Sequence, residues 1–254
     1  MVVVTSRAGT RLQAMASRES AASIAGWALP YTSPVETLVE LEPLRVRCPH
    51  QEPSSVQRLS AAIAEIHWRG RSSGPLVVVC IGTDRSTGDA LGPITGCELL
   101  ARGYPDRLVY GTLDEPVHAG NLREAMAGIE RAHPRAPILA VDACLGTPEN
   151  VGSISLAEGP VRPGAGVNKD LPAVGHFSLT GVVNVAGFME YFVLQNTRLS
   201  LVVRMARVMA ESIAQASLCH EDARVRTRCA AAGPGGVVGL HPARTEVASA
   251  EGGE

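Results

Sequence analysis

The chain has 254 residues, of which 45% are hydrophobic and 19% charged, and its formal net charge is −2. This composition allows a sizeable core. It excludes the basic surface of a typical nucleic-acid-binding protein and the charge excess of a disordered chain. The sequence contains no run of about 18 apolar residues, so we expect no membrane span.

The N-terminal residues and the spacing of the cysteines favour a cytoplasmic location. The first residues, MVVVTSRAGTRLQ, lack the basic-then-apolar order of a secretory signal peptide. The six cysteines include no CxxC pair and no spacing typical of zinc ligands or of a disulfide framework. We therefore expect a reduced, cytoplasmic protein that requires no cofactor.

The two ends of the chain differ in composition from its centre. Residues 1–54 mix Ser, Pro, Arg and Glu, which predicts a poorly ordered N-terminal extension, with a misplaced start site or a removable pro-segment as alternatives. Residues 219–254 are polar and rich in Ala and Gly, which predicts a disordered C-terminal tail. We expect residues 55–218 to form a single domain.

Apolar runs and helical periodicities alternate between these ends. Short apolar runs predict buried strands, and apolar residues three and four apart predict helices. The predicted strands are 76–82, 107–113, 138–143 and 153–156, and the predicted helices are 55–68, 90–102, 121–132 and 188–216. This alternation favours an α/β fold with a mostly parallel sheet and helices on both faces, a three-layer α/β/α arrangement.

Acidic residues follow three of the predicted strands. Asp84 and Asp89 come after the first strand, Asp114 and Glu115 come after the second, and Asp142 closes the third. Because ligands bind beyond the carboxyl ends of the strands in such sheets, we expect these carboxylates to converge on one edge.

Converging carboxylates can carry out acid–base chemistry. A like charge nearby raises the pKa of a carboxyl group, so one group keeps a proton while its neighbour stays ionised. Such a pair can activate water and protonate a leaving amine. Alternatively, the carboxylates bind a divalent cation together with a histidine, and His118 and His176 are the available imidazoles.

Structural roles compete with these functions. Asp89 is placed to cap the helix that follows it, and the acids of the two loops can orient backbone groups. Asp142 differs because it lies in an apolar run, where an unpaired charge costs several kcal/mol. This cost favours a functional role for Asp142.

Five stretches of the chain resemble a known family. They are CIGTDRSTGDALGP (80–93), YGTLDEPVHAGNL (110–122), VDACLG (141–146), GPVRPGAGVNKDLPAVG (159–175) and TGVVNVAGFMEYFVLQNTRLSLV (180–202). In this order they resemble the YyaC family of sporulation proteins, over about residues 75–215. The resemblance implies an α/β peptidase that acts during sporulation or germination.

Two of these stretches are also similar to more distant enzymes. GDALGP looks like the segment of the spore germination protease with one essential aspartate, which maps to Asp89; VDA looks like the segment with the second, which maps to Asp142. The hydrogenase-maturation endopeptidases are similar as well, and they imply a phosphorylase/hydrolase-like fold. Those enzymes recognise nickel through a Glu, an Asp and a His, for which Asp89, Asp142 and His176 are the candidates.

We therefore expect a peptidase that cleaves a spore protein with Asp89 and Asp142. Its partner is a protein or peptide substrate, neither nucleic acid nor membrane, and residues 193–214 form either a core helix or a homo-oligomer interface. The alternatives are a metal-recognising maturation-type endopeptidase and a non-catalytic sporulation factor that keeps the fold as a binding scaffold. Substrate contacts are expected from five further residues: Asp84, Asp114, Glu115, Gly164 and Gly166.

Overall fold

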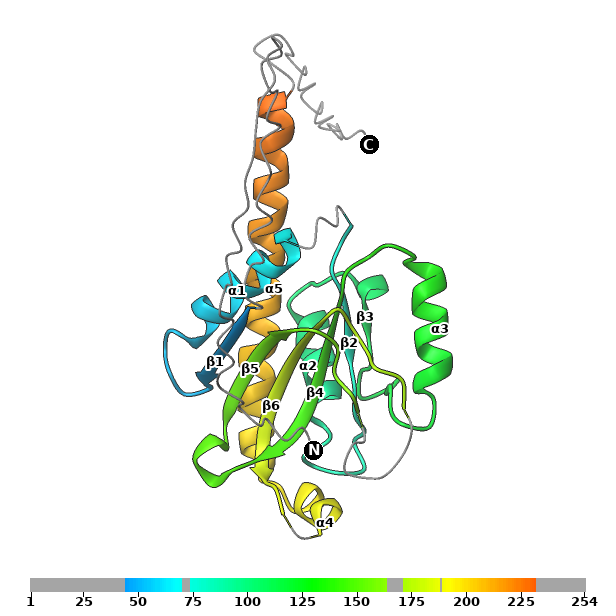
Figure 1. Cartoon of the computed structure of the whole chain (residues 1–254), viewed down its shortest axis with the longest axis vertical. Coiled ribbons are helices and arrows are strands. Elements are labelled where there is room, and N and C mark those ends of the chain that lie inside the picture. Colours follow the sequence, from blue (N-terminus) through cyan, green and yellow to red (C-terminus); the bar gives the residue numbers. More distant parts are fainter. Residues whose placement is uncertain (1–43, 70–73, 164–170, 188, 232–254) are drawn as a thin grey trace, which may run out of the picture.

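The structure, a computed structural model, describes residues 44–69, 74–163, 171–187 and 189–231 (Figure 1). Its strands are β1 (Arg45–Pro49), β2 (Val77–Cys80), β3 (Val109–Tyr110), β4 (Ile138–Gly146), β5 (Ser153–Glu158) and β6 (Phe177–Val185). Its α-helices are α1 (Ser55–Arg69), α2 (Leu91–Ala101), α3 (Leu122–Ala132), α4 (Glu190–Gln195) and α5 (Leu199–Ala231). Two short 3₁₀ helices span Asp106–Leu108 and Pro148–Asn150.

The six strands form one mixed sheet in the order β1-β5-β6-β4-β2-β3. The pairs β2–β3, β2–β4 and β4–β6 are parallel, as the alternation of strands and helices predicts. The pairs β5–β6 and β1–β5 are antiparallel. The fold is therefore α/β, and its parallel half contains the strands that the acidic residues follow.

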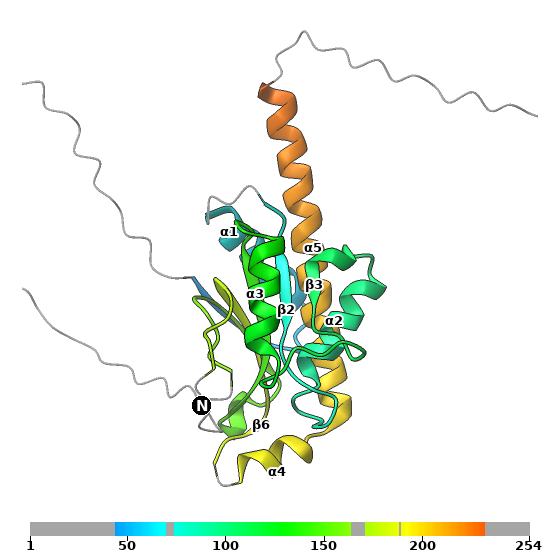
Figure 2. The ribbon, with the colours of Figure 1, turned by 90° about the vertical axis from the view of Figure 1, so that its right-hand side faces the viewer.

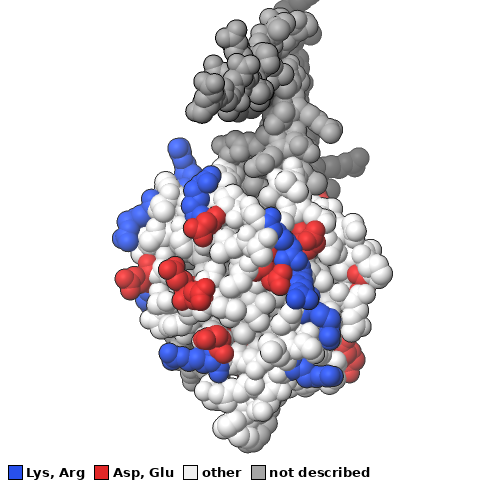
Figure 3. Space-filling view, turned by 180° about the vertical axis from the view of Figure 1, so that it is seen from behind, with Lys and Arg blue, Asp and Glu red and all other residues white. Residues whose placement is uncertain are grey.

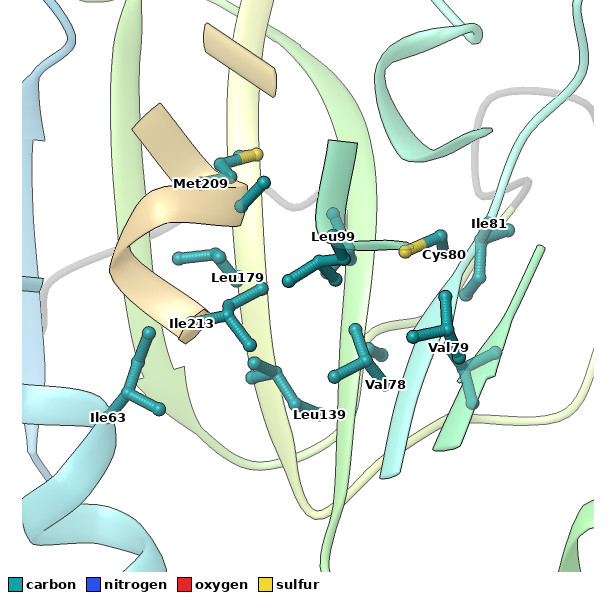
Figure 4. Packing of buried hydrophobic residues seen from close by; sticks show 14 of the residues in the cluster. Ile63, Val78, Val79, Cys80, Ile81, Leu99, Leu139, Leu179, Met209 and Ile213 are labelled. Atoms are coloured by element: carbon teal, nitrogen blue, oxygen red, sulfur yellow. The ribbon is translucent and has the colours of Figure 1, made fainter. Parts of the chain in front are cut away.

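The core packs the sheet against α1, α2 and α5, and α3 adds Leu122, Met126 and Ile129 to the same cluster. All four residues of β2 are buried, as befits a strand covered on both faces. Figure 4 shows Met209 and Ile213 of α5 and Leu99 of α2 packed over Leu139 and Leu179 of the sheet. Each such side chain contributes about 1.5–3 kcal/mol when it is fully buried. Helix α3 stands apart from α2 and α5 (Figure 2).

Helix α5 presents one apolar stripe to this core. The fully buried residues recur at helical spacing: Val202, Met205, Ala206, Met209, Ala210 and Ile213. The stripe is therefore buried inside the folded chain. This confirms, for the residues of the stripe, the expectation that residues 193–214 form a core helix.

The structure differs from the sequence-based expectation at both ends of the domain. Residues 45–49, placed in an irregular extension, form β1 and pair with β5. The predicted helix 188–216 is two helices, α4 and α5, separated at Asn196–Arg198, and α5 continues to Ala231 into the expected tail. The folded unit is therefore larger than residues 55–218.

Strand β6 was not predicted from the sequence, although it pairs with β4 along nearly its whole length. Its sequence, FSLTGVVNV, includes Gly181 and Asn184, which are poor strand formers. A Cβ on Gly181 would lie 2.6–3.1 Å from the ends of the Leu91, Met205 and Met209 side chains, which would have to shift to admit it. Packing by α2 and α5 therefore overrides the local propensity.

The surface seen in Figure 3 carries positive and negative side chains interspersed. An ion-pair network joins α2 to α5 on the helical side of the molecule: Arg102 contacts Glu98 at 2.5 Å and Glu211 at 2.9 Å, and Arg207 contacts Glu98 at 3.2 Å. Exposed pairs of this kind contribute little, at most about 1 kcal/mol each. No helix within the described ranges is long and apolar enough to cross a membrane.

Helix α2 lies so close to the end of β2 that one of its positions must be glycine. A Cβ on Gly92 would overlap the carbonyl oxygen of Ile81, which is backbone and cannot move aside. By contrast, a Cβ on Gly128 of α3 would meet nothing within 4 Å.

These two helical glycines give opposite predictions. Gly92→Ala should lower the free energy of unfolding by at least about 2 kcal/mol, because α2 must shift away from β2. Gly128→Ala should raise it by about 0.5–1 kcal/mol, because alanine favours the helix and fills open space. Denaturant unfolding of both variants tests this, and an equal effect of the two substitutions would contradict the close approach.

Candidate active site

Parallel pairing places Asp89 and Asp142 at the same edge of the sheet. Cys80, the last residue of β2, is in register with Val141 of β4, so Asp142 lies one residue beyond this pairing. The loop that leaves β2 carries Asp89 immediately before α2. The two aspartates therefore meet where the carboxyl ends of β2 and β4 adjoin.

Two glycines hold the loop that carries Asp89. Gly82 has φ +146° and packs against the backbone of Asp89, whose carbonyl oxygen leaves no room for a Cβ. Gly88 donates its N–H to the carbonyl of Leu194 at 2.9 Å, and a Cβ on Gly88 would lie 2.7 Å from the Leu194 side chain. The sheet and α4 thus fix the position of Asp89 from both sides.

Asp89 is not the cap of α2, contrary to one expectation. Ala90 is the N-cap residue, and no side chain caps the helix. Within the described part of the chain, no group is recorded as donating a hydrogen bond to the Asp89 carboxylate. Burial raises the pKa of Asp89 above its ordinary value. Among the described groups, therefore, none holds this desolvated carboxylate in a structural hydrogen bond, which leaves it available to a ligand.

Asp142 is the more strongly perturbed member of the pair. Burial, followed by the negative charge of Asp89, raises the pKa of Asp142 to about 8. The backbone N–H of Ala143 donates to Oδ1 of Asp142 at 2.9 Å and opposes this shift. Both aspartate side chains are half-buried, so solvent still reaches them. Burial thus favours the protonated form of both groups, and the charge of Asp89 adds to this effect at Asp142.

A row of polar residues runs from Asp142 across the sheet. Asp142 is in register with Thr180, Thr180 with Ser155, and Ser155 with Arg47. Registered residues point to the same face of a sheet, here the face away from α5. The Arg47 Nε donates to Ser155 Oγ at 3.1 Å, which anchors the far end of the row. The row offers hydrogen-bonding groups beside the pair.

Thr180 and Ser86, two neighbours of the pair, escaped the sequence-based reasoning. Thr180 was missed because β6 was not predicted; the β-branched pattern TGVVNV was the available signal. Burial and the charge of Asp142 raise the pKa of Cys144 to about 11, so this residue is a neutral thiol near pH 7. In the loop before Asp89, the hydroxyl of Ser86 is buried and has no hydrogen-bond partner among the described groups.

The other predicted acids lie on the same edge but outside the pair. Asp84 is exposed and accepts a hydrogen bond from Thr83 Oγ1 at 3.4 Å. Asp114 and Glu115 are exposed in a turn closed by the bond from Thr112 N–H to the Glu115 carbonyl. Their charges are not among the causes of the Asp142 shift. Gly164 and Gly166 lie outside the described residues.

His176 lies at the wrong end of β4 to join the aspartates. Its Nδ1 accepts the N–H of Ile138, the first residue of β4, at 3.1 Å. Asp142 follows four residues later, about 13 Å along the strand. His118 is in the loop after β3, where its Nδ1 accepts the N–H of Gly120 at 3.0 Å. No group of three or more potential metal ligands occurs in the parts of the chain that the structure describes.

The chain is similar to proteins whose function is not established. A family profile described as "Protein of unknown function (DUF1256)" matches residues 48–212. The chain is 49% identical over 164 residues to "Uncharacterized protein YyaC" of Bacillus subtilis (strain 168), a match covering 65% of this chain and 80% of that protein. The matched segment contains both aspartates.

The raised pKa of Asp142 predicts a pH-dependent stability. The folded protein keeps the Asp142 proton up to about pH 8, whereas the unfolded chain releases it near pH 3.9. Because the folded state binds more protons in this interval, its stability falls as the pH rises. Asp142→Asn retains the oxygen that accepts from Ala143 and carries no charge. The stability of the variant relative to the wild type should rise steadily from pH 5 to pH 8, by at most about 4 kcal/mol.

Denaturant unfolding across pH 5–8 measures this difference. Asp84→Asn is the matched control, because its carboxylate is exposed on the same edge, and it should change stability by less than about 0.5 kcal/mol at every pH. If Asp142→Asn behaves like this control, the two carboxylates do not interact as described.

Proposed function

The chain belongs to the DUF1256 family of proteins of unknown function, and we propose that it is a peptidase in which Asp89 and Asp142 share one proton. The observation that carries this proposal is the placement of Asp89 and Asp142 where the carboxyl ends of β2 and β4 adjoin, with burial and the charge of Asp89 raising the pKa of Asp142 to about 8. Perturbed carboxyl pairs of this kind are frequent at catalytic sites because one group serves as acid and the other as base.

The pair would hydrolyse a peptide bond with a water molecule. The ionised carboxylate removes a proton from water while the water oxygen bonds to the peptide carbonyl carbon, and the protonated carboxyl group gives its proton to the carbonyl oxygen. When the intermediate collapses, the C–N bond breaks, and the carboxyl group that took the water proton gives it to the amine nitrogen. The other carboxylate takes a proton from one hydroxyl of the intermediate, whose oxygen becomes the new carbonyl oxygen. The pair ends with one proton, as it began. This protonation state is lost as the pH rises above about 8.

The substrate we propose is a spore protein, and the setting is the cytoplasm of a sporulating cell or spore. The support is the resemblance of the segments around Asp89 and Asp142 to the spore germination protease. We also propose a three-layer α/β/α, hydrolase-like architecture, with α3 covering the face opposite α2 and α5. The separation of α3 from those helices in Figure 2 is consistent with it.

The rival functions have less support. Nickel recognition by a maturation-type endopeptidase requires a third ligand, and His176 lies at the far end of β4. The residues that the structure describes therefore do not fit that metal site. A non-catalytic scaffold would leave its acids dispersed, whereas Asp89 and Asp142 interact electrostatically.

Cleavage of a small acid-soluble spore protein tests the proposal. Asp89→Asn and Asp142→Asn should each lower the rate of cleavage by at least about 100-fold, because either change removes the acid or the base. Asp84→Asn should leave the rate within about twofold, since its carboxylate is exposed outside the pair. Product masses measured over time give the rates and the cleaved bonds.

Two results would contradict the proposal. One is full activity in both pair variants. The other is the absence of cleavage by the wild-type chain for this substrate and for unfolded casein.

A further inference from the structure

A pocket of about 430 Å³ opens at the end of β6, beside α4. The pocket is shallow and open to solvent, so it can receive a side chain from the surface without any rearrangement of its walls. Its walls are mainly apolar, with amides at the margin: Val185, Ala186, Phe192, Val193, Asn184 and Asn196. The amides hold its shape, since Asn184 Nδ2 donates to the Val193 carbonyl at 3.2 Å and Asn196 Nδ2 to the Phe192 carbonyl at 2.8 Å.

The apolar side chains around this pocket are unusually exposed. Phe192 is 52% exposed, Val185 37%, and Met189, at the start of α4, 50%. Met189 also has φ +58°, a left-handed conformation that costs a non-glycine residue of order 1 kcal/mol or more. A strained, exposed apolar segment is destabilising unless it contacts something else. The backbone of Met189 is therefore a local cost to stability beside the pocket.

The pocket is joined by backbone contacts to both segments of the aspartate pair. Leu194, next to the pocket residue Val193, accepts the N–H of Gly88, and Gly88 precedes Asp89. Ala186 in the pocket wall donates its N–H to the carbonyl of Gly146, the last residue of β4, at 2.7 Å. An extended peptide advances about 3.3 Å per residue. A peptide bound at the pair would thus reach the pocket with a residue a few positions from the cleaved bond.

We propose that this pocket, formed by the end of β6 and by α4, binds a large apolar side chain of the peptide substrate and so determines which peptides are cleaved. The inference rests on the proposed peptidase function. The charge of the site agrees with it, because the pocket walls contain no ionisable side chain. The chemistry expected of the substrate is a Leu, Ile, Met or Phe side chain on an extended segment.

Binding of synthetic peptides to a catalytically silent chain tests the inference. The full chain with Asp142→Asn is titrated with acetylated octapeptide amides of Ala and Ser that carry one Phe, Leu or Asp at each position in turn, and affinity is measured by isothermal titration calorimetry. Phe and Leu should favour binding at one position by roughly tenfold over Ser and Asp. Adding Phe192→Ala should remove this preference.

Two further variants keep the test independent of folding defects. Tyr191→Ala, which removes a more exposed aromatic ring (61%) next to Phe192 but outside the pocket wall, should retain the tenfold preference. Ala186→Phe, which fills the pocket, should abolish it. Equal affinities for all peptides, or an unchanged preference in both Phe192→Ala and Ala186→Phe, would overturn the inference.

Light scattering at the same concentrations distinguishes a peptide-binding pocket from an interface between two copies of the chain. If Phe192→Ala changes the oligomeric state and not the peptide preference, the patch binds a second copy of the chain and the inference is wrong. The peptidase proposal fails separately, through the absence of cleavage by the wild-type chain. If the wild type and Phe192→Ala cleave with the same sequence preference, the proposed role of the pocket is wrong and the peptidase proposal stands.

Discussion

The backbone of α2 lies directly against the end of β2, and the rest of the site depends on this contact. Glycine at positions 82 and 92 permits it, because a side chain at either position would overlap a carbonyl oxygen. The contact brings the loop before α2 down onto the sheet edge and leaves Asp89 beside the strand that carries Asp142. Larger side chains at positions 82 and 92 would bury more apolar area than glycine does. Burial alone therefore does not explain why α2 lies so close to β2.

Placing two carboxylates together opposes folding. Each loses hydration, and the charge on one disfavours ionisation of the other, so Asp142 retains its proton towards pH 8. The buried stripe of α5 and the fully buried strand β2 supply the apolar contacts that offset this cost. The same proximity that weakens the fold makes one group an acid and its neighbour a base, which is the basis of the proposed hydrolysis. The exposed α4 pocket adds a second local cost at the same edge.

The sequence predicted those strands and site residues that a local pattern identifies. It did not predict the features that depend on packing between distant segments. The apolar runs at β2 and β4 predicted their strands, and the position of Asp142 inside such a run identified it as a functional candidate. Strand β6 was missed because Gly181 and Asn184 disfavour strands locally. The close packing of α2 and α5 on Gly181 cannot be read from the local sequence. His176 looked available in the sequence, but its distance from Asp142 depends on the register of β4 with β6.

A direct titration of the aspartate carboxyl carbons tests the shared proton. In protein labelled with ¹³C at the aspartate Cγ, one resonance, assigned by its absence in Asp142→Asn, should titrate near pH 8. In Asp89→Asn this resonance should titrate at a lower pH, because the neighbouring negative charge is gone. If Asp142 titrates near its ordinary value of about 3.9, or is unaffected by Asp89→Asn, the carboxylates do not share a proton and the account is wrong.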